Sequence, residues 1–482
     1  MSTWDAALQI KAWRKGHALP KTSHLHLAFN DNFWVCCPLA MAGEDPSLHA
    51  VLLGDAKSQG QLLAAPDPRS LRHRLEFFSR LRRNFDEYFQ ACLNREDDFP
   101  QLLVPSQSAA KVLVGLADYL SYLQEPKEGG KQLKGWTQDA RELGRLWQLY
   151  AARLEIPGQQ ILLSAYELLD QHWAFGQDLQ GHLGAQLVWL DPPQGQNLML
   201  AAAAAETQPM GAKTDAYMDQ KELAPALEAW AKVERSSSSS LASFRRQEIE
   251  DMLQKVLRPI WNSTLQAKSY SDDWPILEGI DELRQREREA FEYHMTHLSN
   301  DGKFSRSDSP MRAIYSLAER EDAAEQYQAA AVWGDRMHRE KACLDGDILR
   351  GRVEHLPTDH GNNLVVISTQ RWLRIRRGDE LVLMDGEDRI AAVVENLVRR
   401  GNETRVLLHT NSTRTIPAVG QITDWSGSAP DWYRIHSERG KIARNLGELP
   451  VTHQTAPEAA KAPKAPTWDG NNDPLAAIED MR

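Results

Sequence analysis

Alternating apolar and polar positions give residues 347–424 the pattern of short strands. A period of two places successive side chains on opposite faces of a sheet, and turn residues separate one run from the next. A strand-rich unit of this length is too short for a full-size sandwich, so we predict a small, strongly bent β-barrel over residues 346–427. The predicted strands are Ile348–Glu354, Leu364–Ser368, Glu380–Met384, Ile390–Val398 and Arg405–His409.

The pattern over residues 1–125 predicts a mixed α/β domain. An amphipathic helix over Trp4–Lys15 comes first, a long helix covers Ser70–Leu93, and a further helix carries an apolar stripe from Val112 to Leu123. The predicted strands are His24–Phe29, Phe33–Met41, Leu48–Gly54 and, after the long helix, Gln101–Pro105.

Helical periodicity dominates the middle of the chain. Residues 126–200 predict a helical domain, and residues 201–214 predict a linker. Residues 215–345 predict a long-helix hairpin or arm, because their apolar stripes do not hold a strict heptad. Together with the two strand-containing units, this organisation predicts a multidomain α+β fold.

Residues 428–482 lose all periodicity and predict a flexible tail. Three of its apolar residues, Trp468, Leu475 and Ile478, predict a short docking peptide that binds a protein partner. The alternative is a terminus that packs on its own domain.

Composition and charge narrow the class of protein. The chain has 482 residues and a net charge of −11, which favours solubility and argues against a general nucleic-acid coat. The four cysteines, Cys36, Cys37, Cys92 and Cys343, lack zinc-ligand spacing and are few for an oxidising compartment. We see no secretion signal, and the longest apolar run is too short to span a bilayer, so we expect a cytoplasmic protein without a membrane partner.

Familiar catalytic motifs are missing from the sequence. A phosphate-binding loop requires a glycine where Glu206 stands, and Ala212 separates Gly211 from Lys213, so we do not expect ATP hydrolysis. His24 and His26 would share one strand face, with His49 near them, and a metal site is the alternative to a surface histidine pair. We expect no cofactor.

One constellation indicates nuclease chemistry. The order helix–strand–strand–strand–helix–strand in residues 1–105 resembles the core of the restriction-endonuclease-like nucleases. That resemblance implies an Asp/Glu-x-Lys on the third strand, matched here by Asp55-Ala56-Lys57, and a second carboxylate from Asp31 or Asp45. Two carboxylates would hold Mg²⁺ while Lys57 orients the attacking water. The alternative is a turn with solvated charges.

Clustered arginines are the strongest electrostatic signal. Guanidinium groups match phosphate geometry, so these clusters predict contacts with DNA or RNA, and internal salt bridges are the alternative. The predicted contacts are Arg69, Arg72, Arg80 and Arg83 in the long helix, and Arg371, Arg374, Arg376, Arg377, Arg399 and Arg400 in the predicted barrel. The run Arg377-Gly-Asp-Glu-Leu-Val-Leu383, with the strands after it, resembles small barrels inserted in some superfamily 1 helicases.

These observations favour a non-catalytic accessory or adaptor protein of a nucleic-acid-processing assembly. The arginines would contact nucleic acid, and the C-terminal tail would contact a partner enzyme of the helicase or nuclease class. Two alternatives stay open. One is the metal-dependent nuclease described above, and the other is a pure protein–protein scaffold.

Overall fold

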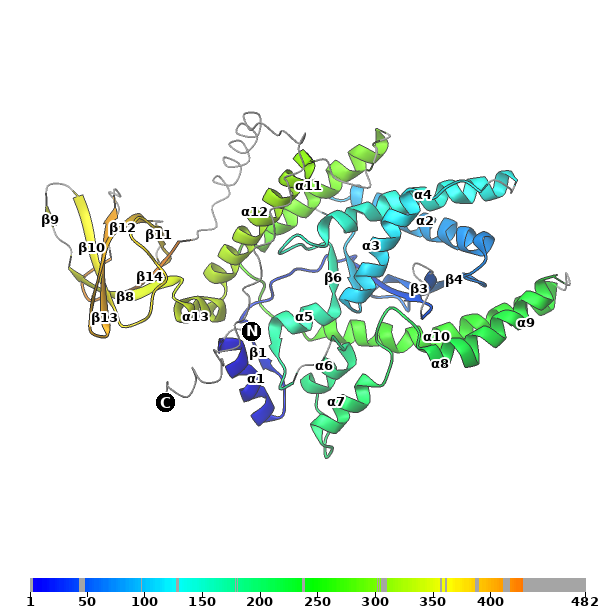
Figure 1. Ribbon diagram of the computed structural model, residues 1–482, viewed down its shortest axis with the longest axis horizontal. Helices are drawn as coiled ribbons and strands as arrows, with labels where there is room; N and C mark the ends of the chain where they lie inside the picture. Colours follow the sequence, from blue (N-terminus) through cyan, green and yellow to red (C-terminus); the bar gives the residue numbers. More distant parts are fainter. Residues whose placement is uncertain are drawn as a thin grey trace, which may run out of the picture. The chain divides into compact units, whose positions relative to one another are not determined.

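The computed structural model describes residues 3–427 apart from short gaps. Asp45 and the tail residues Trp468, Leu475 and Ile478 lie outside the described residues. Within the described part the chain mixes helices and strands, which confirms the predicted α+β class (Figure 1). The gaps are residues 43–47, 97, 127–129, 178, 180, 236–238, 301, 303, 305–309, 356–357, 360–361, 386–389 and 411–416.

A mixed sheet organises the N-terminal half. It runs in the order β4-β3-β2-β5-β6, and its first three strands form an antiparallel meander. β5 then pairs parallel with β2, and β6 pairs parallel with β5. The strands are β2 (Trp34–Ala40), β3 (Leu48–Asp55), β4 (Gln61–Ala64), β5 (Leu102–Val104) and β6 (Leu162–Ser164).

Helices cover both faces of this sheet, so its central strands are buried almost throughout. On one face lie α2 (Leu71–Leu93), α3 (Gln107–Ser121) and α4 (Lys131–Arg153). On the other lie α5 (Ala165–His172), α6 (Leu183–Leu190) and α10 (Ser239–Ser269). Cys36 belongs to the first core and Cys37 to the second, as alternation along β2 requires.

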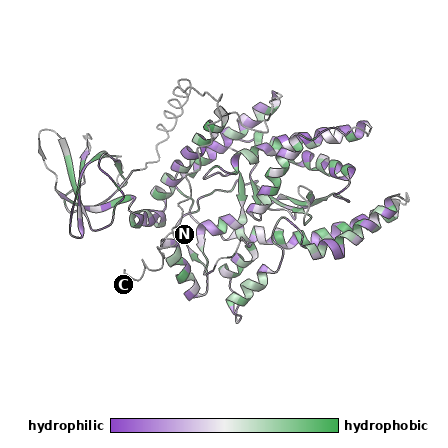
Figure 2. Cartoon of the chain, viewed as in Figure 1, coloured by the Kyte–Doolittle hydropathy of each residue, from purple (hydrophilic) through white to green (hydrophobic). Residues whose placement is uncertain are grey.

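The remaining helical segments extend from this core. Figure 2 shows hydrophobic and hydrophilic residues mixed along α9 and α10, as expected for amphipathic helices. The elements are α1 (Thr3–Lys15), β1 (Leu19–Pro20) paired with β7 (Trp173–Ala174), α7 (Leu198–Glu206), α8 (Ala216–Met218), a π-helical turn η1 (Asp219–Leu223), α9 (Ala224–Arg235), α11 (Ile280–Ser299), α12 (Pro310–Gly334) and α13 (Arg336–Asp345).

Segments predicted as separate units share one core. Leu253, Leu257 and Trp261 of α10 pack in the same cluster as Val35 and Leu52 of the sheet. A buried ion pair ties α11 to α4: Arg153 donates to both carboxylate oxygens of Glu287, at 2.9 and 2.8 Å. The α11 and α12 helices are therefore bound to the α/β core through charge as well as apolar contact.

Two sequence predictions about elements are wrong. His24–Phe29 is not a strand: Leu25 forms one isolated bridge with Ile276, and side chains bind several of the other backbone groups, as described below. Ala201–Ala205 is not a linker but part of α7, whose N-terminus is capped by Asn197. Alanine has the highest helix propensity, but a run of it carries no periodic signal. The short strand β4 was not predicted.

The predicted strand-rich unit is confirmed as a closed ring of antiparallel strands. Its order is β13-β12-β11-β14-β8-β10, and pairing between β10 and β13 closes it. The ring surrounds an apolar core that includes Val353, Ile367, Val394 and Trp425. Its strands are β8 (Ile348–His355), β10 (Asn362–Thr369), β11 (Glu380–Leu383), β12 (Ala391–Arg400), β13 (Glu403–Thr410) and β14 (Ile422–Ser426), with β9 (Thr358–Asp359) paired to β10.

Two glycines of α4 provide a test of helix packing. A Cβ on Gly144 would lie 2.5 Å from the Ser121 nitrogen and 2.8 Å from the Leu120 Cβ, whereas one on Gly135 would meet nothing within 4 Å. We expect Gly144→Ala to lower the free energy of unfolding by about 1–3 kcal/mol, because α3 would be displaced. Gly135→Ala should raise the free energy of unfolding by about 0.5–1 kcal/mol. Denaturant titrations measure both changes, and equal shifts in the two variants would contradict this packing.

Candidate functional site

The arginines of α2 and of the turn before it divide into exposed and half-buried residues. Arg69, Arg72 and Arg83 are exposed. Arg80 is half-buried and donates to the Ala64 carbonyl oxygen of β4, and burial lowers its pKa. The neighbouring Phe77, Phe78 and Phe85 are buried in the core, so they cannot stack on bases. The α2 surface therefore offers charge without accessible rings.

The arginines of the strand ring differ in their partners. Arg350 donates to both carboxylate oxygens of Asp424, each at 2.6 Å, and Arg405 pairs with Glu354 at 3.1 Å. By contrast, four of the arginines predicted as phosphate contacts are exposed and make no ion pair with any described residue. They are Arg376, Arg377, Arg399 and Arg400.

These four arginines lie on or beside one strand. Gly378, next to Arg377, donates its backbone N–H to the Val394 carbonyl of β12 at 2.8 Å. Arg399 follows five residues later on the same strand, roughly 17 Å away at the rise of a β-strand. Exposed arginines thus lie beside the middle of β12 and at its C-terminal end, where alternation along the strand directs Arg399 and Arg400 to opposite sides.

An exposed tryptophan, absent from the sequence-based candidates, accompanies them. In the segment before Arg377, Trp372, Arg374 and Arg376 are exposed while Leu373 and Ile375 pack on the ring core. Trp372 is 58% exposed, and the Arg374 guanidinium lies 5.4 Å from its ring centroid. Arg374 also pairs with Asp347 at 3.3 Å. The alternation Trp-Leu-Arg-Ile-Arg, visible in the sequence, is the signal that could have identified Trp372.

The end of α13 positions this tryptophan. Gly346 follows the helix with φ +80, and a Cβ there would lie 2.7 Å from Cε3 of Trp372. The indole therefore rests on a backbone position that only glycine can supply. We define the ring face as Trp372, Arg374, Arg376, Arg377, Arg399 and Arg400. Arg371, also a sequence candidate, is half-buried and is not part of it.

The nuclease candidates Asp31, Asp55 and Lys57 lie in or next to turns. Asp55 and Lys57 lie at the turn that closes β3, where the Asp55 carboxylate accepts the Lys57 backbone N–H at 2.7 Å. β3 is the second strand of the meander, and the third, β4, reads Gln-Leu-Leu-Ala. Asp31 lies in the turn before β2. Neither Asp31 nor Asp55 belongs to a group of side chains, among the described residues, that could hold a metal ion.

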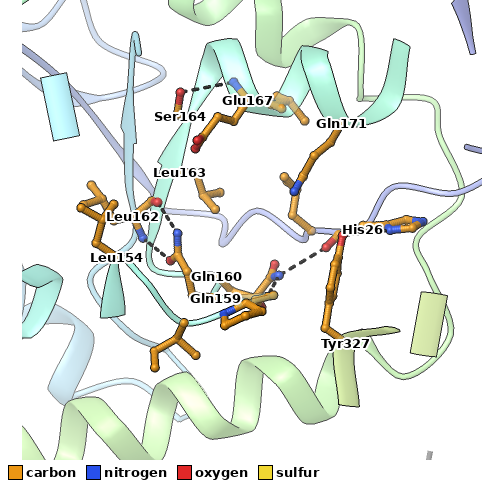
Figure 3. Close-up of a pocket in the computed structure, with 15 residues that line it drawn as sticks. His26, Leu154, Gln159, Gln160, Leu162, Leu163, Ser164, Glu167, Gln171 and Tyr327 are labelled. Atoms are coloured by element: carbon orange, nitrogen blue, oxygen red, sulfur yellow. Dashed lines mark hydrogen bonds between the residues drawn. The ribbon is translucent and has the colours of Figure 1, made fainter. Parts of the chain in front are cut away.

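A partly open pocket lies beside the segment of residues 23–30. Its volume is about 180 Å³, which suits a few waters or a small polar molecule but not a nucleotide. Figure 3 shows Ser164 and Glu167 opposite Gln159 and Gln160, with Tyr327 closing one end. Burial, with Asp170, raises the pKa of Glu167, and burial raises the pKa of Tyr327 to about 12.

Side chains from distant elements bind several backbone groups of this segment, while the Leu25 N–H and carbonyl pair with the backbone of Pro275 and Leu277. His172, whose pKa burial lowers to about 3, accepts the His26 N–H at 2.9 Å. Gln160 accepts from the Ala28 N–H at 2.9 Å and donates to the His26 carbonyl at 3.3 Å. In the same way, Gln101 accepts from the Asn30 N–H at 2.9 Å and donates to the Ala28 carbonyl at 2.8 Å. The pocket wall is thus held by buried amides rather than by a neighbouring strand.

Comparisons with known proteins add no assignment. No protein-family model matches the chain, and comparisons with curated proteins and with solved structures yield no match. Among the described residues, no helix has the length and apolar character needed to cross a membrane.

Gln160 gives a test of the side-chain support. In Gln160→Leu the buried Ala28 N–H loses its acceptor, at a cost of about 1–3 kcal/mol. We expect hydrogen exchange at Ala28 to accelerate about 10- to 100-fold. Gln159→Leu is the matched control, because Gln159 accepts from Ile161 and Leu162 instead. Unchanged exchange at Ala28 in the first variant would contradict this account.

Proposed function

We propose that the chain is a non-catalytic accessory protein that binds single-stranded nucleic acid through the ring face. The strand ring would act as a small β-barrel that presents this face, and the chain would bring a partner enzyme of the helicase or nuclease class to the strand. The observation that carries the proposal is the exposed Trp372, with the Arg374 guanidinium 5.4 Å from its ring, in the same segment as Arg376 and Arg377, which form no ion pair with any described residue.

The chemistry of the ring face favours single strands over duplexes. An exposed indole can stack on an unpaired base of any sequence, and guanidinium groups neutralise the phosphates on either side. Because Arg376, Arg377, Arg399 and Arg400 have no ion pair among the described residues, no such pair must break before they bind. A net charge of −11 restricts binding to such a local face.

The α2 arginines and the C-terminal tail complete the proposal. Arg69, Arg72, Arg80 and Arg83 would add weaker phosphate contacts, Arg80 least because Ala64 already engages it. Trp468, Leu475 and Ile478 would bind the partner enzyme as a docking peptide, since their apolar side chains follow a polar tether.

Substitutions in the ring face test this function. Trp372→Ala should weaken binding of a labelled single strand by about 5- to 150-fold, since base–aromatic stacking is worth about 1–3 kcal/mol. Arg376→Ala with Arg377→Ala should instead lower the slope of log affinity against log salt by about 0.7 for each phosphate that is no longer neutralised. Fluorescence anisotropy at several salt concentrations measures both effects.

Matched controls come from the same chain. Trp13→Ala removes an indole of nearly equal exposure, 59% against 58%, far from the ring in sequence. Arg405→Ala removes a ring arginine that is paired with Glu354. Both should bind like the wild type. Wild-type protein that binds neither DNA nor RNA at low salt would contradict the proposal and leave the scaffold alternative.

The nuclease alternative has one observation in its favour. Apart from the two-residue β1, the order α1-β2-β3-β4-α2-β5 repeats the predicted helix and strand order. We expect the probe to stay intact with Mg²⁺ or Mn²⁺, because Asp55 is engaged in its own turn. Metal-dependent cleavage that Asp55→Ala abolishes would replace the accessory function with a nuclease.

A further inference from the structure

Three side chains with metal-binding atoms converge beside the segment of residues 23–30. His26 comes from that segment, Asp335 precedes α13, and His338 lies in the first turn of α13. One nitrogen or oxygen atom from each lies within 4.8 Å of the other two. The sequence pattern pairs His26 with His24 as a candidate metal site, but His24 instead contacts the Ser23 hydroxyl at 3.0 Å.

Backbone groups hold the Asp335 carboxylate in place from both sides. Oδ2 accepts the N–H groups of Ser23 and His24 at 2.8 and 2.9 Å, and Oδ1 accepts those of Met337 and His338 at 2.8 and 3.2 Å. The side chain is fully buried. A buried carboxylate oriented by backbone donors is a preorganised ligand, because little of its freedom remains to be lost on binding.

A histidine that binds a metal ion through one ring nitrogen usually forms a hydrogen bond through the other, and His26 has a partner at each ring nitrogen. Its Nε2 lies 3.2 Å from Asp335 Oδ2, and its Nδ1 lies 3.1 Å from the Tyr327 hydroxyl. A carboxylate only accepts, so Nε2 carries the proton and Nδ1 accepts from Tyr327. With Nε2 on a metal ion, Nδ1–H would donate to the phenol oxygen, which fixes the ring and its tautomer.

His338 supplies a nitrogen without another function. Its Nδ1 is buried and has no hydrogen-bond partner among the described atoms, although it lies 3.8 Å from Asp335 Oδ1. Buried polar atoms in folded proteins are nearly always bonded, so an unbonded nitrogen directed at a carboxylate requires a reason. An ion held between the two would provide one.

We propose that His26, Asp335 and His338 form a site for a divalent transition-metal ion. Ligands about 2.1 Å from a tetrahedral zinc ion lie about 3.4 Å apart. The observed separations are 3.2 Å from His26 Nε2 to Asp335 Oδ2 and 3.8 Å from His338 Nδ1 to Asp335 Oδ1. Two imidazoles and one carboxylate suit Zn²⁺ or Fe²⁺, whereas Mg²⁺ and Ca²⁺ prefer oxygen ligands. On binding, the single His26 ring proton moves from Nε2 to Nδ1, so the ring stays neutral and releases no net proton. Water completes the coordination beside the partly exposed His338.

Such an ion would join two distant parts of the chain. The segment of residues 23–30 belongs to the N-terminal core, and α13 leads through Gly346 into β8 of the strand ring. The site is independent of the proposed nucleic-acid function, so each can fail without the other.

Metal stoichiometry and a pair of histidine variants test the proposal. The full chain is first stripped with a chelator, then incubated with Zn²⁺ alone and desalted. It should retain one zinc per chain, and its thermal unfolding midpoint should be higher than that of the stripped chain. His338→Gln should weaken Zn²⁺ binding by at least about 100-fold, since even outer-shell changes cost 10- to 100-fold. Tyr327→Phe should weaken it about tenfold.

His409→Gln is the matched control. His409 is 26% exposed and lies 3.6 Å from Glu395, while His338 is 32% exposed, so the two variants remove similar histidine–carboxylate contacts. Parallel incubations with Fe²⁺ under argon and with Mg²⁺ identify the preferred ion. The proposal would be overturned if the wild-type chain retained neither zinc nor iron. It would also be overturned if His338→Gln bound Zn²⁺ with wild-type affinity, or if His409→Gln lost as much Zn²⁺ affinity as His338→Gln.

Discussion

The fold depends on how one buried segment, residues 23–30, satisfies its backbone polar groups. An unpaired N–H or C=O away from water costs about as much as a lost hydrogen bond, so every such group requires a partner. The partners here are side chains of Asp335, His172, Gln160 and Gln101, from widely separated parts of the sequence, and the backbone of Pro275 and Leu277, which pairs with Leu25. These side chains are themselves buried and need the segment in return. The requirement is mutual, and it fixes the segment against the helices around it.

Buried charge follows the same rule. Arg153 is satisfied by Glu287 and Glu319, and Arg350 by Asp424 and Glu340. Removing Arg153 or Glu287 would leave an uncompensated buried charge, which is far costlier than an exposed one, whereas Arg350 is only half-buried. Once these pairs are formed, the arginines that remain free of ion pairs among the described residues include the four that lie on or beside β12. An acidic chain can thus present a cationic ring face.

The two proposals meet at α13. Its first turn carries His338, directly after the capping Asp335, and the glycine after its end supports Trp372 of the ring face. A metal ion would hold one end of this helix, while the other end positions the aromatic ring proposed to stack on bases.

Local pattern determined much of this architecture. The alternation in residues 347–424, the long stripe of α2 and the apolar runs of β2 and β3 each predicted their elements, because such patterns reflect contacts within a few residues. The arginine clusters, too, were visible as sequence. Only tertiary structure decided which arginines are paired, that His24–Phe29 is bound by amides rather than strands, and that Ala201–Ala205 is helical. His26 meets Asp335 across 309 residues, and no periodicity encodes a contact made by the packing of the whole chain.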